Sequence, residues 1–217
     1  MLILGIDEAG RGPVVGPMVI GGVLIEESLE KKLKKLGAKD SKQLTPAKRE
    51  ELEPKIRKMA KEVHFISIEA SEIDEKRKRI SLNELEAMKM AELIEKFENK
   101  PDRIIIDLPD PDGKMFERRI RKYIDLNAKI IAEHKADVNH VVVSAASIIA
   151  KVERDRAVRE IEKKYGISLK TGYSHDPFTI EFLEKLEGEA PDFVRKSWET
   201  FKRITEKKFQ KKLFDWD

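Results

Sequence analysis

Cysteine is absent from this 217-residue chain. The chain can therefore form neither a disulfide nor a thiolate metal site, which is compatible with a reducing cytoplasm. Its four histidines are scattered, so no zinc site is expected. No apolar run approaches the roughly 20 residues that span a membrane, and the first residues lack the basic segment of a signal peptide. We expect a cytoplasmic protein without membrane contact.

The chain also lacks a large excess of either charge, because 39% of its residues are charged but the net charge is only +3. Such a balance does not by itself indicate a nucleic-acid partner, so the placement of individual residues must do so. The abundance of lysine and glutamate is typical of a thermophile's surface. The length suffices for one substantial core with at most a small appendage.

Five segments have the apolar pattern of strands, and helical patterns follow or separate them. The strands are expected around Gly5 and at residues 16–25, 63–70, 103–107 and 129–133. The helices are expected at residues 28–36, 46–60, 81–97, 112–123 and 142–165. This order predicts an α/β fold, a mixed five-stranded sheet with helices on both faces.

The character of the chain changes after Gly172. Two helical segments, 177–186 and 197–213, follow with no strand between them. We therefore predict a main domain over residues 1–172 and a small C-terminal helical extension over residues 173–217.

The stretch 2–12 reads L-I-L-G-I-D-E-A-G-R-G and brings two carboxylates to the end of the first strand. Asp7 and Glu8 would point to opposite faces of a continuing strand, so they can share a site only where the strand ends or bends. The glycines of the following turn let a ligand approach the backbone closely. Taken alone, the Asp7-Glu8 pair favours the simpler interpretation, a charged strand end followed by an ordinary glycine turn.

Two more aspartates are expected near the same edge of the sheet. The apolar run 104–106 ends in Asp107, and Asp137 follows the last predicted strand. Ligands of open α/β sheets bind beyond the carboxyl ends of the strands. A lone acid there is more often a cap or a salt bridge, but Asp7, Glu8, Asp107 and Asp137 together could converge. Oxygen ligands alone favour Mg²⁺ or Mn²⁺, and two such ions can promote phosphodiester hydrolysis.

The opening stretch, continued to Gly16-Pro17, resembles the signature of the type 2 ribonucleases H, specifically the ribonuclease HII family. Further matching blocks follow in family order: D-S-K-Q-L-T at 40–45, I-I-I-D at 104–107, H-K-A-D at 134–137, S-A-A-S-I-I-A-K at 144–151 and T-G-Y at 171–173. The resemblance covers the chain to about Pro177 and is strongest to archaeal members. Arg11, where the ribonuclease HIII family has lysine, speaks against that sister family.

The resemblance implies a ribonuclease H-like fold and a metal-binding, catalytic tetrad of Asp7, Glu8, Asp107 and Asp137, with two Mg²⁺ or Mn²⁺ ions in the substrate complex. It also implies that the backbone of Gly10, Arg11 and Gly12 contacts the ribose 2′-hydroxyl, and that Tyr173 stacks on the next sugar. The candidate phosphate contacts are Lys42, Ser147 and Lys151. Ser174-His175-Asp176 departs from the Pro-Ser-Asp expected after this tyrosine.

The function so implied is that of a monomeric endoribonuclease acting on RNA–DNA hybrids and on single ribonucleotides in duplex DNA. Water would attack on the 5′ side of the ribonucleotide and leave 3′-hydroxyl and 5′-phosphate ends. One alternative is a DNA junction nuclease of the same fold, which would show little preference for a 2′-hydroxyl. Another is a non-catalytic hybrid-binding module, which is disfavoured because four converging acids without metal would repel one another and phosphate.

The last eight residues have the spacing of a sliding-clamp-binding peptide. Gln210 is followed three positions on by Leu213 and three further by Trp216. Leucine and tryptophan would serve as hydrophobic anchors, and a chain terminus is free to order on a partner. The alternative is that Leu213, Phe214 and Trp216 pack on the C-terminal helices.

Overall fold

The computed structural model describes residues 1–38, 44–187 and 189–214, with side chains as far as residue 210. Its strands are β1 (Leu2–Ala9), β2 (Met18–Glu26), β3 (Glu62–Ile68), β4 (Arg103–Asp107) and β5 (Lys129–Glu133). They form one sheet in the order β3-β2-β1-β4-β5. β1 pairs antiparallel with β2 and parallel with β4, which is itself parallel to β5. The predicted mixed five-stranded sheet is confirmed.

The predicted helices are present: α1 (Glu30–Lys35), α2 (Pro46–Met59), α4 (Leu82–Glu95), α5 (Gly113–Arg121), α7 (Val141–Tyr165), α8 (Pro177–Lys185) and α9 (Glu199–Phe214). The Thr45 hydroxyl accepts a hydrogen bond from the Lys48 N–H and caps α2, as its position before Pro46 predicts. Three short elements were not predicted: the 3₁₀ turn η1 (Glu27–Leu29), α3 (Ala70–Lys76) and α6 (Ala136–Asn139). They are too brief to show a helical period.

The chain divides into two compact units. We call the first the sheet unit, which comprises Met1–Ala9, Val19–Ser67 and Ser81–Glu153. The second, the loop-and-helix unit, comprises Gly10–Met18, Ile68–Ile80 and Arg154–Asp217. Segments 10–18 and 68–80 thus belong to the same compact unit as the C-terminal helices. The boundary predicted between residues 172 and 173 stays a prediction.

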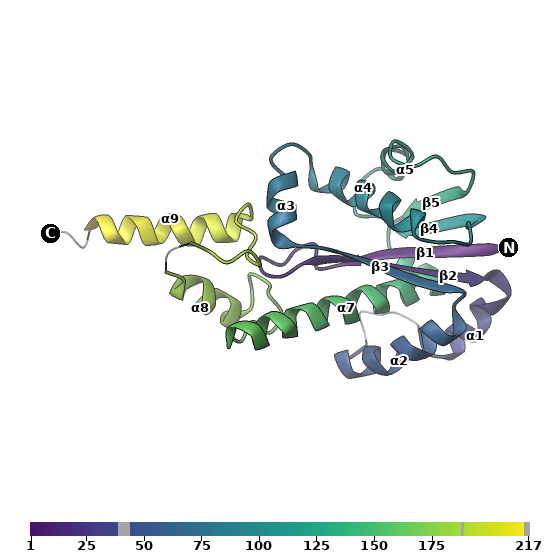
Figure 1. Cartoon of the computed structure of the whole chain (residues 1–217), viewed down its shortest axis with the longest axis horizontal. Helices are drawn as coiled ribbons and strands as arrows, with labels where there is room; N and C mark the ends of the chain where they lie inside the picture. The colour runs from purple at the N-terminus through teal and green to yellow at the C-terminus, as the bar shows by residue number, and fades with distance from the viewer. Residues whose placement is uncertain (39–43, 188, 215–217) are drawn as a thin grey trace. The chain divides into compact units, whose positions relative to one another are not determined.

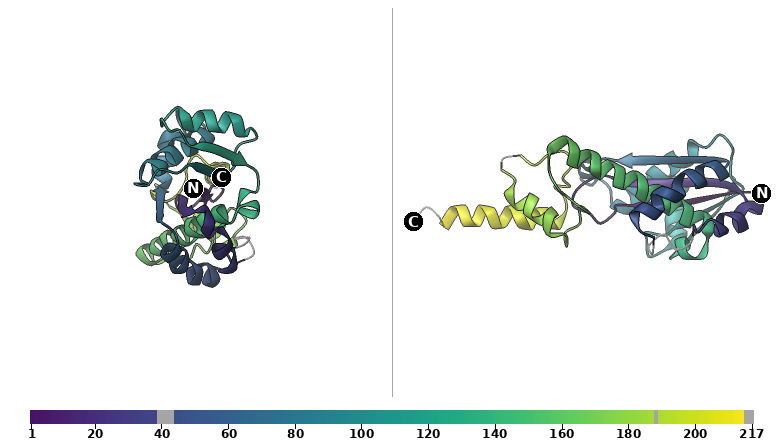
Figure 2. Two further views of the ribbon diagram at one scale, coloured as in Figure 1. Left: turned by 90° about the vertical axis from the view of Figure 1, so that its right-hand side faces the viewer. Right: turned by 90° about the horizontal axis from the view of Figure 1, so that it is seen from below.

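Helices cover both faces of the sheet within the sheet unit. α4 and α5 lie on one face, and α1, α2 and the first part of α7 lie on the other (Figure 1). Seen from the α7 side, these last three helices lie in front of the strands (Figure 2). Ile3, Val23, Leu52 and Val142 are fully or almost fully buried in the core between α2, α7 and the sheet.

Two glycines let α7 approach the sheet at backbone distance. A Cβ on Gly5 would lie 2.5 Å from the carbonyl carbon and oxygen of Val142, and one on Gly21 would lie 2.6 Å from the carbonyl oxygen of Ala146. Val142 and Ala146 are one turn apart on the same face of α7. Gly21 is the cross-strand partner of Asp7. The close packing of α7 therefore brings its side chains to the end of β1.

The loop-and-helix unit has its own apolar core. It is formed by Val14 and Val15 of the first loop, by the second half of α7, and by α8 and α9; its buried members include Val158, Leu183, Val194 and Ile204. Val15 forms an isolated antiparallel bridge with Val194. None of the helices in the described residues combines the length and apolar character that crossing a bilayer requires.

We expect Gly5→Ala to lower the free energy of unfolding by about 1–3 kcal/mol, because the new methyl group would overlap backbone atoms of α7. Thermal unfolding followed by circular dichroism measures the loss, which corresponds to a drop of about 2–4 °C in Tm per kcal/mol. Gly166→Asn is the control, because Gly166 has φ +64° and no atom within 4 Å of a Cβ, and asparagine tolerates this backbone region. An unchanged Tm for Gly5→Ala would contradict the close approach of α7.

Candidate active site

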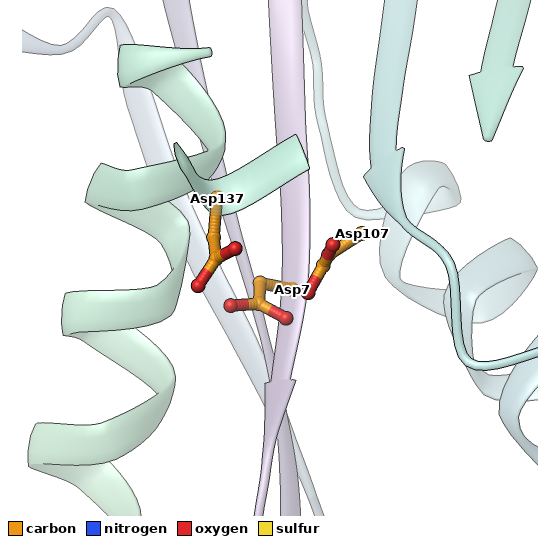
Figure 3. A group of neighbouring side chains, drawn as sticks. All are labelled: Asp7, Asp107 and Asp137. Atoms are coloured by element: carbon orange, nitrogen blue, oxygen red, sulfur yellow. The ribbon is translucent and has the colours of Figure 1, made fainter. Parts of the chain in front are cut away.

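Three aspartates from distant parts of the chain meet at one place in the sheet unit. Asp7 comes from β1, Asp107 ends β4, and Asp137 lies in α6. Each offers a carboxylate oxygen, and these oxygens lie within 4.8 Å of one another (Figure 3). Asp7 and Asp107 come together because β1 and β4 are parallel and Ile6 pairs with Ile106, one position earlier in each strand.

A backbone hydrogen bond helps to place the third aspartate. The Ala136 N–H donates to Oδ1 of Asp107 at 2.8 Å, which ties the start of α6 to the end of β4. The preceding Lys135 has φ 61°, in the left-handed region, so the chain turns sharply between β5 and α6. Asp137 follows in the first turn of α6 and is 1% exposed.

Burial and charge repulsion act together on Asp7. Its pKa is raised well above the usual value, mainly by burial and next by the neighbouring Glu8 carboxylate, with a smaller contribution from Asp107. A hydrogen bond with the Ser147 hydroxyl and the charge of Lys151 lower the pKa but do not outweigh these effects. Crowded oxygen ligands of this kind fit a hard divalent cation, which would replace their repulsion with attraction.

Glu8 lies beside this group rather than within it. Its backbone N–H donates to Oδ1 of Asp7 at 2.8 Å, and its side chain is half-buried. Its charge raises the pKa of Asp7, so the two carboxylates are close enough to interact. The membership of Glu8 in the metal-binding set stays a prediction.

The predicted phosphate contacts have different surroundings. Ser147 is completely buried on α7 and hydrogen-bonds to Asp7, while Lys151, one turn further along, is half-buried. Their contact with phosphate stays a prediction. Lys42 lies outside the described residues.

The two predicted substrate loops meet in the loop-and-helix unit. The N–H groups of Val14 and Val15 donate to the carbonyl of Gly172 at 2.9 and 3.2 Å. A Cβ on Gly12 would lie 3.3 Å from the nearest atom of the Tyr173 ring, so the ring lies directly against this glycine. The structure thus brings the loop around Gly10, Arg11 and Gly12 next to Tyr173, although the two are far apart in the sequence.

The loop after Tyr173 is organised by Asp176. Its Oδ2 accepts hydrogen bonds from the N–H and hydroxyl of Thr171 at 3.0 and 2.7 Å, and its Oδ1 caps α8 through the Phe178 N–H. His175, in the stretch that departs from the family pattern, places its ring centroid 5.3 Å from that of Tyr173.

Sequence reasoning missed two buried arginines of this unit. Arg154 donates to the carbonyl of Thr171 at 2.7 Å and lies 5.5 Å from the centre of the Tyr173 ring. Its position three residues after Lys151 on one helix was an available signal. Arg195 gave no such signal, because a basic pair such as Arg195-Lys196 usually lies on a surface. Burial, and next the charge of Arg154, lower the pKa of Arg195 to about 9, so it is cationic at neutral pH.

The structure describes only the first of the three residues of the predicted clamp-binding pattern in full. Gln210 is exposed on α9, which continues to Phe214. The side chain of Leu213 and the whole of Trp216 lie outside the described part of the chain. Clamp binding and its alternative both stay predictions.

Comparison with known proteins gives a consistent result. Residues 4–201 match the family model of ribonuclease HII. The ribonuclease HII of Pyrococcus horikoshii is 44% identical over 210 residues, which cover 95% of this chain and 94% of the relative. The crystal structure of the ribonuclease H2 from the same organism aligns with a TM-score of 0.89, at 44% identity over 95% of this chain and 98% of that one.

A second solved structure, that of the PCNA:RNase HII complex from Archaeoglobus fulgidus, aligns with a TM-score of 0.83. It is 37% identical, over 92% of this chain and 96% of that one. The family match spans nearly the whole chain, and the predicted carboxylates of β1, β4 and α6 stand together. The chain therefore belongs to the ribonuclease HII family, the metal-dependent endoribonucleases that act on RNA–DNA hybrids.

Proposed function

We propose that this enzyme also incises duplex DNA on the 5′ side of single ribonucleotides, leaving 3′-hydroxyl and 5′-phosphate ends. The observation that supports metal-assisted hydrolysis is the group of three carboxylates whose oxygens lie within 4.8 Å of one another. No cysteine is available, and the cluster contains no histidine, so the donor set consists of hard oxygens.

We propose Mg²⁺ or Mn²⁺ as the cofactor, with two ions in the substrate complex. Asp7, Asp107 and Asp137 would hold them, with Glu8 as the fourth carboxylate. When bound, such ions activate water and stabilise the leaving oxygen of a phosphodiester. The hydrogen bond from Ser147 orients Asp7, and the Ala136 N–H orients Asp107, so the chain itself fixes two of the carboxylates. No protein side chain needs to act as the nucleophile.

Substrate recognition would come from the two loops of the loop-and-helix unit. We propose that the backbone of Gly10, Arg11 and Gly12 contacts the ribose 2′-hydroxyl and that Tyr173 stacks on the next sugar. Their proximity supports this, since the Tyr173 ring fills the space beside Gly12. Lys42, Ser147 and Lys151 are the proposed phosphate contacts.

A sliding clamp is the proposed protein partner. The ribonuclease HII of Archaeoglobus fulgidus was solved in complex with PCNA, and the present chain carries Gln210, Leu213 and Trp216 at clamp-peptide spacing. We propose that the protein works as a monomer in the cytoplasm. A non-catalytic hybrid-binding role is disfavoured by the retained carboxylates.

We expect Asp7→Asn to lower the rate of incision at a single embedded ribonucleotide by about a hundredfold or more at saturating Mg²⁺. Removing one buried charge removes a metal ligand but little packing, so hybrid binding should be largely retained. Cleavage-site mapping against an all-deoxy duplex gives the rate, and calorimetry with Mn²⁺ gives the metal affinity. Asp192→Asn, an exposed acid, is the control. Activity within tenfold of wild type would refute the metal assignment.

Tyr173→Ala should reduce incision at an isolated ribonucleotide by about tenfold or more, because a stacking contact is worth roughly 1–3 kcal/mol. Long RNA–DNA hybrids should suffer less, since many registers are productive on them. The two substrates are compared by kcat/KM. Tyr165→Ala removes another ring of the same unit that is 47% exposed and serves as the control. Equal losses on both substrates would show that Tyr173 only supports the fold.

A peptide of residues 210–217 should bind the cognate clamp with a Kd on the order of micromolar, through two apolar anchors and a glutamine contact. Trp216→Ala should abolish this binding, whereas Asp217→Asn, one residue further, should retain it. Isothermal calorimetry measures both. No binding of the wild-type peptide, together with Trp216 fluorescence that is shielded from a soluble quencher in a Trp198→Phe variant of the free enzyme, would favour packing of the terminus on the fold.

A further inference from the structure

Arg195 is a completely buried arginine whose charge faces backbone oxygens. Its guanidinium donates to three carbonyls, those of Gly10 at 2.6 Å, Arg11 at 3.1 Å and Gly16 at 3.1 Å. All three belong to one loop, residues 10–16, which we call the glycine loop. Within the described part of the chain, no carboxylate forms an ion pair with Arg195. The hydrogen bonds of this buried guanidinium therefore all go to carbonyls of the glycine loop.

Trp198 extends the same arrangement by one residue. Its indole Nε1–H donates to the carbonyl of Gly12 at 3.1 Å. The guanidinium carbon of Arg195 lies 4.8 Å from the centre of the indole ring, a cation–π distance, so the two side chains support each other. Together they hold the carbonyls of three successive residues, Gly10, Arg11 and Gly12.

The orientation of these carbonyls fixes the orientation of the neighbouring N–H groups. The described residues contain no cis peptide bond, and in a trans peptide the C=O and N–H point in opposite directions. The N–H groups of Arg11 and Gly12 share peptide planes with the carbonyls that Arg195 binds, so they are directed away from it. Pro13 follows and has no N–H. The glycine loop thus presents two adjacent donors on the side opposite Arg195, an arrangement that suits an oxygen ligand.

We propose that Arg195, assisted by Trp198, is a positioning residue for ribose recognition: it holds the carbonyls of Gly10 and Arg11 so that the N–H groups of Arg11 and Gly12 face the substrate. This inference rests on the proposed contact between the glycine loop and the 2′-hydroxyl. Arg195 itself does not touch substrate. Arginine is required because its planar fork reaches three carbonyls at once, whereas lysine offers a single nitrogen.

The test compares affinities for two duplexes that differ in one 2′-hydroxyl, one with a single ribonucleotide and one all-deoxy. Fluorescence anisotropy in the presence of a metal chelator keeps both duplexes intact and gives the ratio of the two Kd values. Arg195→Lys, which keeps the charge but loses the fork, should reduce the wild-type ratio by about tenfold or more. Trp198→Phe, which keeps an aromatic face but loses the Nε1 donor, should reduce it by about two- to tenfold.

Arg77→Met is the matched control. Arg77 is exposed, its guanidinium carbon lies 4.7 Å from the centre of the Trp198 ring, and its guanidinium hydrogen-bonds to Ser197 rather than to the glycine loop. It should leave the ratio unchanged. Thermal unfolding of every variant separates a loss of fold from a loss of discrimination. If Arg195→Lys fails to fold, Trp198→Phe decides, since it leaves Arg195 in place.

The possible results distinguish ribose recognition by the glycine loop from the positioning role of Arg195. A wild-type ratio near one would overturn ribose recognition by the glycine loop and this inference with it. If the wild-type ratio is well above one and folded Arg195→Lys keeps it, the positioning role alone is overturned. If the lysine variant is unfolded, an unchanged ratio in Trp198→Phe has the same meaning. A lower Tm with an unchanged ratio would show that the buried arginine only stabilises the fold.

Discussion

Buried like charges at the end of β1 are the constraint around which the sheet unit is built. Two carboxylates about 4–5 Å apart repel by about 3–4 kcal/mol at an effective dielectric of about 20, which is a large share of the about 5–15 kcal/mol that stabilises a domain. One carboxylate oxygen from each of three aspartates lies within 4.8 Å of the others. The pKa of Asp7 is raised mainly by burial, next by the charge of Glu8, and to a smaller extent by that of Asp107. The protein tolerates this arrangement because a strong scaffold of parallel strands and a closely packed helix imposes it.

Glycines in the strands allow α7 to pack directly on the sheet. Gly21 stands opposite Asp7 on β2, and a side chain there would collide with the backbone of α7 at Ala146. Because α7 lies directly on the strands, its next residue, Ser147, reaches Asp7 with a hydrogen bond. The same principle recurs in the other unit, where Gly12 leaves room for the ring of Tyr173. In the sheet unit the missing Cβ allows backbone contact, and in the loop-and-helix unit it leaves the Tyr173 ring close to the loop.

The sequence was sufficient for the strands and the long helices, because these depend on local patterns. The three aspartates were singled out by the resemblance to ribonuclease HII, since a lone acid at a strand end is more often a cap or a salt bridge. An apolar run that ends in an acid, as at Asp107, places that acid at a strand end whatever the tertiary details. The short α6 was not foreseeable, since four residues contain too little periodicity. Nor was Arg195, whose role depends on carbonyls contributed by a loop that lies far away in the chain. Sequence patterns reveal which residues an element carries, but not which backbone groups it will meet.

The two units bury charges of opposite sign. In the sheet unit, negative side chains are buried together and are suited to an external cation. In the loop-and-helix unit, the cation is internal: Arg195 is buried, and the negative ends of peptide dipoles from the glycine loop surround it. Two of the three carbonyls that Arg195 binds, those of Gly10 and Arg11, share peptide planes with the N–H groups of Arg11 and Gly12, which therefore point away from the guanidinium. The third, that of Gly16, precedes Pro17 and has no such partner. The proposed function uses both features, the carboxylates as a cation site for phosphate chemistry and the N–H groups of the glycine loop as neutral donors for the sugar.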